Sequence, residues 1–92
     1  MGNFSGSAGY KGNISASANI CPRQCDMVGI FVSAASATPT ITVYDSSSTT
    51  TTDPIVTVFT PVAATYYAIP ASVESGIYIV ISGTVNCAVF FI

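Results

Sequence analysis

The sequence contains no histidine and no tryptophan, and only 7% of its residues are charged, against about 25% in an average soluble domain. Histidine is the usual general acid or base at neutral pH, and a nucleophilic serine or cysteine needs such a base beside it. The four carboxylates are scattered along the chain. The composition therefore predicts a protein that is not an enzyme, with no catalytic residues, no cofactor and no small-molecule substrate.

Positive charge is equally scarce, since Lys11 and Arg23 are the only cations. Two cations cannot neutralise the series of phosphates that nucleic-acid affinity requires, and they give little attraction to an anionic membrane. The longest apolar runs, residues 77–81 and 87–92, fall short of the ~18–20 residues that span a bilayer. The opening residues lack the apolar core of a signal peptide. We expect neither nucleic acid nor membrane as a partner.

The three cysteines, Cys21, Cys25 and Cys87, are too few for a closed structural zinc site, which needs four ligands. Three residues separate Cys21 from Cys25, so a local disulfide is sterically possible. We favour the interpretation that all three are free thiols, buried or half-buried, as cysteine commonly is.

Asp45 and Asp53 flank a stretch of serines and threonines, residues 46–52. Carboxylate, hydroxyl and carbonyl oxygens suit calcium, which makes a calcium site one interpretation of this loop. The favoured interpretation gives both residues turn roles, because Asp45 ends a predicted strand and Asp53 precedes Pro54. No metal site is therefore predicted anywhere in the chain.

What the sequence does contain is strand-forming residues in short runs. Glycine, proline or polar turn residues interrupt these runs roughly every 8–12 residues, which is the spacing of a sandwich or a small barrel. No run keeps a helical period, and at most one helical turn fits near residues 71–75. We predict strands at residues 13–19, 27–34, 40–45, 54–60, 66–69, 76–82 and 84–92.

The predicted fold is all-β, a small antiparallel β-sandwich of about six to eight strands, jelly-roll or immunoglobulin-like. Residues 1–12, rich in glycine and serine, are expected to form a flexible N-terminal arm, and residues 13–92 the β-sandwich domain. The predicted core is formed by the inward rows of the strands: Val28, Ile30, Val32, Ile41, Val43, Ile55, Phe59, Ile77, Ile79, Ile81, Val85, Val89 and Phe91.

The last two predicted strands are apolar on both faces, although a strand with one solvated face normally has a polar second row. Phe90 and Ile92 belong to this second row, and Phe4 and Tyr10 in the arm have no local packing partner. A net charge of −2 gives little repulsion between copies. We therefore predict a homo-oligomer, with Phe4, Tyr10, Phe90 and Ile92 as candidate interface residues.

From residue 27 onward, over about two-thirds of the chain, the order of elements resembles small β-sandwich proteins of tailed-phage virions. The likeness lies in Val28-Gly29-Ile30-Phe31-Val32, Thr40-Ile41-Thr42-Val43-Tyr44-Asp45, a Ser/Thr loop, Thr57-Val58-Phe59-Thr60-Pro61, Tyr67-Ala68-Ile69-Pro70, Gly76-Ile77-Tyr78-Ile79 and Ser82-Gly83-Thr84. The resemblance implies a non-catalytic virion subunit, assembled in the host cytoplasm. It would be a capsid decoration (cement) protein that stabilises the shell, with copies of itself and a major capsid or other virion protein as partners.

Two alternatives stay open. Within the same class, the chain could be a small neck, tail or fibre component of a virion. The other class is a cell-surface or carbohydrate-binding β-sandwich module, which would present an aromatic platform. The chain has tyrosines but no tryptophan for such a platform, and tyrosines in strands more often lie at the edge of a core.

Overall fold

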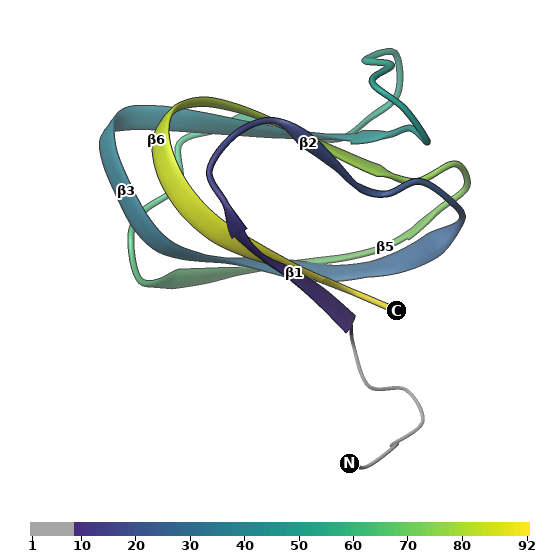
Figure 1. Cartoon of the computed structure of the whole chain (residues 1–92), viewed down its shortest axis with the longest axis horizontal. Helices are drawn as coiled ribbons and strands as arrows, with labels where there is room; N and C mark the ends of the chain where they lie inside the picture. The colour runs from purple at the N-terminus through teal and green to yellow at the C-terminus, as the bar shows by residue number, and fades with distance from the viewer. Residues whose placement is uncertain (1–8) are drawn as a thin grey trace, which may run out of the picture.

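Two long strands organise the fold. The computed structural model describes residues 9–92, which form six strands and no helix (Figure 1). The strands are β1 (Gly9–Ile14), β2 (Ala18–Cys21), β3 (Cys25–Asp45), β4 (Pro54–Phe59), β5 (Thr65–Val73) and β6 (Ile77–Phe91). β3 and β6 have 21 and 15 residues, whereas a typical strand has about 5–6. Within the described residues there is no helix that could cross a membrane.

β3 and β6 pair antiparallel along nearly their whole length. The pairing runs from Met27 opposite Phe91 to Asp45 opposite Ile77. In Figure 1 the two strands curve together around one end of the molecule and return along its other side. Each strand therefore contributes to two layers, with its first half in one layer and its second half in the other.

The bend in this pair depends on one glycine. The register of β3 shifts between Ser36 and Thr40, and Gly83 faces this segment from β6 with φ 93°. Such a backbone conformation is in the region that favours glycine. A Cβ at Gly83 would also lie 2.8 Å from the Cα of Pro39, so a larger residue would push the two strands apart. Thr38 adopts φ 48° at the same bend.

Each layer is completed by two edge strands, one on each side of the β3–β6 pair. In one layer, β1 pairs with the C-terminal half of β6 and β5 pairs with the N-terminal half of β3. In the other layer, β2 pairs with the N-terminal half of β6 and β4 pairs with the C-terminal half of β3. β1 and β2 are thus the edges on one side of the molecule, and β4 and β5 are the edges on the other. The predicted small antiparallel β-sandwich is confirmed.

The core lies between the layers. Eight of the predicted core residues are fully buried: Ile30, Val32, Ile41, Val43, Ile77, Ile79, Val85 and Val89. Four others are partly buried and pack against them: Ile55, Phe59, Ile81 and Phe91. Val28 was predicted wrongly, because a register shift between Met27 and Gly29 interrupts the alternation and buries Met27 instead.

Several predicted boundaries were also wrong. Residues 9–12, expected in the arm, belong to β1, while residues 1–8 lie outside the described part of the chain. Residues 27–34 and 40–45 are one bent strand, and so are residues 76–82 and 84–92 apart from their ends. Residues 71–73 continue β5 and do not form a helical turn. Residues 15–17 interrupt the first predicted strand as the chain crosses from one layer to the other.

Candidate binding surfaces

The outer side of the β1–β6–β3–β5 layer carries a cluster of large apolar side chains. The strand register places Tyr10 beside Phe90 and Phe31 beside Tyr66. The alternation of side chains along β6 puts Ile92 on the same side as Phe90. Tyr10 is 70% exposed, Ile92 52% and Tyr66 47%. We call these five side chains the outer apolar surface.

Three rings of the outer apolar surface form a row across the sheet. The ring centroids of Tyr10 and Phe90 are 6.4 Å apart, and those of Phe90 and Tyr66 are 6.3 Å apart. The row crosses β3 at Gly29, where a Cβ would lie only 2.6 Å from Cζ of Tyr66. The Tyr66 hydroxyl donates a hydrogen bond to the carbonyl oxygen of Val28, 3.3 Å away. Packing and this bond position the rings before any partner binds.

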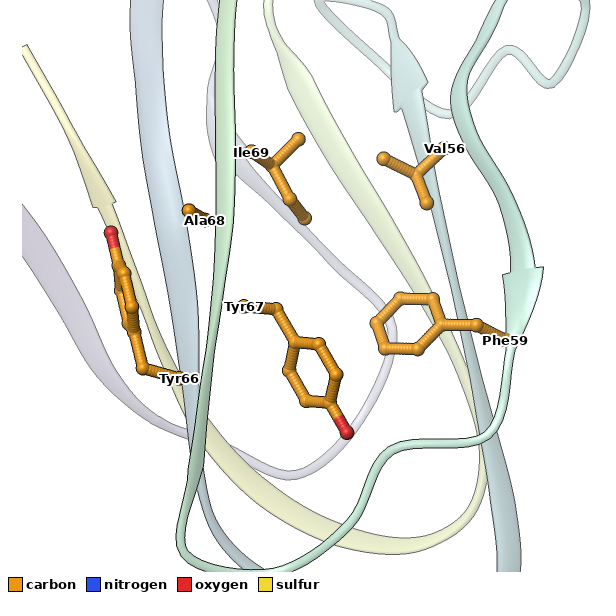
Figure 2. Close-up of a pocket in the computed structure, with 6 residues that line it drawn as sticks. All are labelled: Val56, Phe59, Tyr66, Tyr67, Ala68 and Ile69. Carbon is orange, nitrogen blue, oxygen red and sulfur yellow. The ribbon is translucent and has the colours of Figure 1, made fainter.

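A groove of about 450 Å³ opens on the other side of β5, between the edges of β4 and β5 (Figure 2). It is lined by Val56, Phe59, Tyr66, Tyr67, Ala68 and Ile69. Figure 2 shows Tyr67 and Ile69 pointing from β5 toward β4, while Tyr66 points away from β4. The rings of Phe59 and Tyr67 lie 5.1 Å apart and close one end of the groove. The groove and the outer apolar surface thus meet at the edge of β5, where Tyr66 belongs to both.

The groove offers little that would orient a small polar ligand. Its volume is within the ~300–1,000 Å³ of small-molecule sites, but such sites place a few polar groups to fix the ligand. Here the hydroxyl of Tyr67 already accepts a hydrogen bond from the backbone N–H of Val62, 2.8 Å away in the β4–β5 loop. Neither β4 nor β5 contains a charged residue. The lining suits apolar side chains.

The carboxylate of Asp45 holds the turn between β5 and β6. It accepts hydrogen bonds of 2.8–3.2 Å from the backbone N–H groups of Glu74, Ser75 and Gly76. Burial alone would raise the pKa of this carboxyl, but the three N–H groups outweigh it and hold the pKa below its ordinary value of 3.8. The backbone N–H of Asp45 donates to the carbonyl oxygen of Asp53, 2.8 Å away.

These contacts favour the turn role of Asp45 and Asp53 over a calcium site, because N–H donors already occupy the Asp45 carboxylate. The oxygen-lined hollow beside it is small, about 160 Å³. Within residues 9–92 there is no group of three or more carboxylates, thiols or imidazoles that could hold a metal ion.

The three cysteines are buried and free, as predicted. Burial, and then the neighbouring Cys21 thiol, raise the pKa of Cys25 to about 12. Burial raises the pKa of Cys87 to about 11, and its thiol donates to the carbonyl oxygen of Ile14 at 3.7 Å. Because the thiolate is the reactive form, Cys25 and Cys87 are inert near neutral pH and serve as core residues.

The structure brings Tyr10, Phe90 and Ile92 together on the outer apolar surface, while Phe4 lies outside the described residues. An interface role for these residues stays a prediction. Sequence reasoning missed Phe31 and Tyr66 as members of this surface, because their place near Phe90 depends on β3 pairing with both β5 and β6. Comparison of the chain with protein families, with curated proteins and with solved structures found no match to any of them.

Proposed function

We propose that the chain is a non-catalytic structural subunit of a virion, a capsid decoration protein that binds the shell through the outer apolar surface. The observation that carries this proposal is the exposure of three large side chains, Tyr10, Tyr66 and Ile92, each at least 47% exposed. Contiguous apolar clusters on the outside of small proteins commonly mark binding sites for other proteins. Rigid aromatic side chains are also the residue type that dominates interface energetics.

The composition supports the same function. With 7% charged residues and a net charge of −2, copies of the chain repel one another weakly. A protein that diffuses freely at high concentration gains from such repulsion, whereas a subunit held on a shell does not need it. The resemblance in element order to tailed-phage virion proteins supports a phage capsid as the shell.

The proposal is tested by counting copies of the chain on purified virions. Virions carrying the parent chain, Tyr10→Ser or Val58→Ser are isolated on density gradients, and bound copies are quantified by mass spectrometry. Val58 is the matched control, because it is 61% exposed but lies on β4, away from the outer apolar surface. Loss of an interface aromatic costs about 2 kcal/mol or more, so Tyr10→Ser should weaken attachment about 30-fold or more.

Val58→Ser should attach like the parent chain. A parent chain that never accompanies the particles would refute the virion function. Equal attachment of Tyr10→Ser and the parent would remove the outer apolar surface from the mechanism. Electron microscopy of labelled particles would separate a shell position from the neck, tail and fibre positions that are the alternatives within this class.

A carbohydrate-binding module is the second candidate, and one observation favours it. The row of rings includes Tyr10 and Tyr66, both well exposed, and exposed aromatic rings combine an apolar face with a polar hydroxyl. A glycan array probed with the full chain tests this candidate. Binding of a defined glycan that is lost in Tyr66→Ser would favour it over the virion function.

A further inference from the structure

The β4 and β5 edges differ from the edges on the opposite side of the molecule. β1 carries Lys11, the only charged residue in the four edge strands. Charged residues and register irregularities both protect exposed sheet edges, and all four edge strands have register irregularities, so charge is what differs between them. β4 and β5 contain no charged residue, and in the described part of the chain they pair with β3 but not with each other. This side of the sandwich therefore lacks the edge charge that Lys11 gives to the opposite side.

Proline gives β5 limited protection, and it also limits where a further strand can pair. Pro70 has no N–H and lies where the register with β3 shifts, between Met27 and Gly29. Residues 65–68 pair regularly with residues 29–32 of β3. The stretch 65–69, centred on Tyr67, is therefore the part of the β5 edge that is free of proline and suited to accept a strand.

We propose that this edge pairs antiparallel with the β5 edge of a second copy, around a two-fold axis near Tyr67. An antiparallel edge is self-complementary about a two-fold axis, so two identical strands can exchange the same backbone hydrogen bonds. The inward row of the added strand, Tyr67 and Ile69 of the second copy, then lies over the groove between β4 and β5. The groove is the place where the sandwich lacks a strand, and the second copy supplies that strand.

The absence of charge in the groove favours this occupant over a charged segment. Burying a charged segment in the groove would leave its charge without a counterion, because none of the six side chains that line it is charged. The β5 strand of a second copy, Thr-Tyr-Tyr-Ala-Ile-Pro-Ala-Ser-Val, brings no charge to the groove. The net charge of −2 on each copy adds little long-range repulsion.

The size of the face is sufficient for a specific dimer. The molecule measures 38 × 32 Å in the plane of Figure 1 and only 17 Å along the line of view, the direction across the strands. The side that bears β4 and β5 is therefore one of the two broad faces. An ellipse of these axes encloses roughly 950 Å², so a dimer that covers most of this face would approach the about 800 Å² per partner of a standard interface.

The dimer itself does not depend on the proposed function. Its consequence for binding to a shell deepens that function and rests on it. Pairing around Tyr67 sets Ala68 of one copy opposite Tyr66 of the other, on the outer side of the joined sheet. The outer apolar surfaces of the two copies then become one continuous surface. Through it, each copy of the dimer contacts the shell at the same time.

The first test measures mass in solution by light scattering across a concentration series, without particles. The parent chain, 9.4 kDa per copy, should double its mass at high concentration. Ile69→Lys places a charge in the groove and should stay monomeric, while the matched variant Ala16→Lys, which adds the same charge on the opposite side, should dimerise like the parent. Circular dichroism must show that each variant is folded.

The second test does not depend on the stability of Ile69→Lys. Single variants Tyr66→Cys and Ala68→Cys are oxidised in air with a copper catalyst, alone and as a mixture. The mixture should form disulfide-linked dimers, and each variant alone should form far fewer, because the proposed register pairs residue 66 with residue 68. The parent chain is the control for its own buried thiols.

A parent chain that stays monomeric at every concentration would overturn the dimer, as would an Ile69→Lys variant of doubled mass. Cross-linking of either single variant as efficiently as the mixture would overturn the register. These outcomes are separable from the virion function: a monomer that still attaches to particles leaves that function standing. A dimer that never attaches to particles would support the dimer and refute the virion function.

Discussion

Replacing Gly83 by alanine tests whether the bend that joins the two layers depends on one residue. An alanine in the left-handed region costs about 1–2 kcal/mol. Gly83 has φ 93°, and its new Cβ would also lie 2.8 Å from the Cα of Pro39, a backbone atom that cannot turn away. Overpacking of this kind costs about 1–3 kcal/mol. Gly83→Ala should therefore lower the free energy of unfolding by about 2–5 kcal/mol.

Such a loss is large for a chain of 92 residues, whose total stability is about 5–14 kcal/mol. Urea denaturation, monitored by circular dichroism and tyrosine fluorescence, measures this loss. An unchanged slope of the unfolding free energy against urea concentration would indicate an unaltered fold. Ser82→Ala and Thr84→Ala are the controls, since both neighbours are exposed and should shift stability by about 0.5 kcal/mol or less. A Gly83→Ala variant as stable as these controls would refute this account of the bend.

Three further predictions concern the core, the Asp45 turn and the thiols. Ile79→Ala removes a fully buried side chain between the layers and should cost about 2–5 kcal/mol, measured by the same denaturation. The lowered pKa of Asp45 contributes stability that is present above about pH 4 and is lost as the pH falls through the folded-state pKa. Asp45→Asn should therefore be less stable than the parent at pH 7, with a smaller further loss on acidification to pH ~2. Because their pKa values are raised, Cys25 and Cys87 should resist a thiol reagent at pH ~8 until urea unfolds the chain, and rapid labelling of the native protein would contradict this.

The strands of this fold were predictable where side-chain alternation is regular. In β6, alternation correctly assigned Ile77, Ile79, Val85 and Val89 to the buried side. The same rule failed at Val28, because one register shift near the start of β3 reverses the sides of the following residues. A bulge is set by pairing with distant strands, and nothing in the local sequence distinguishes it from regular alternation.

The merging of the predicted strands has a similar physical reason. Pro39 and Gly83 are ordinary turn signals, and in isolation each predicts the end of a strand. In the fold they face each other, so both strands bend at the same level and keep their pairing on either side of it. The contact joins residues 44 positions apart in the sequence, and local patterns cannot report it.

The second apolar row of β6 shows why the outer apolar surface could be only half predicted. Sequence reasoning required a cover for this row, from loops or from another subunit. The structure supplies part of the cover from neighbouring strands: Tyr44 packs beside Tyr78 at 6.2 Å, and Tyr10 and Tyr66 pack beside Phe90. This packing leaves Phe90 half-buried, while the Tyr10 and Tyr66 rings that cover it are themselves exposed. A ring that shields its neighbour and stays exposed is a ready contact for a partner, because binding buries it without rearranging the sheet beneath.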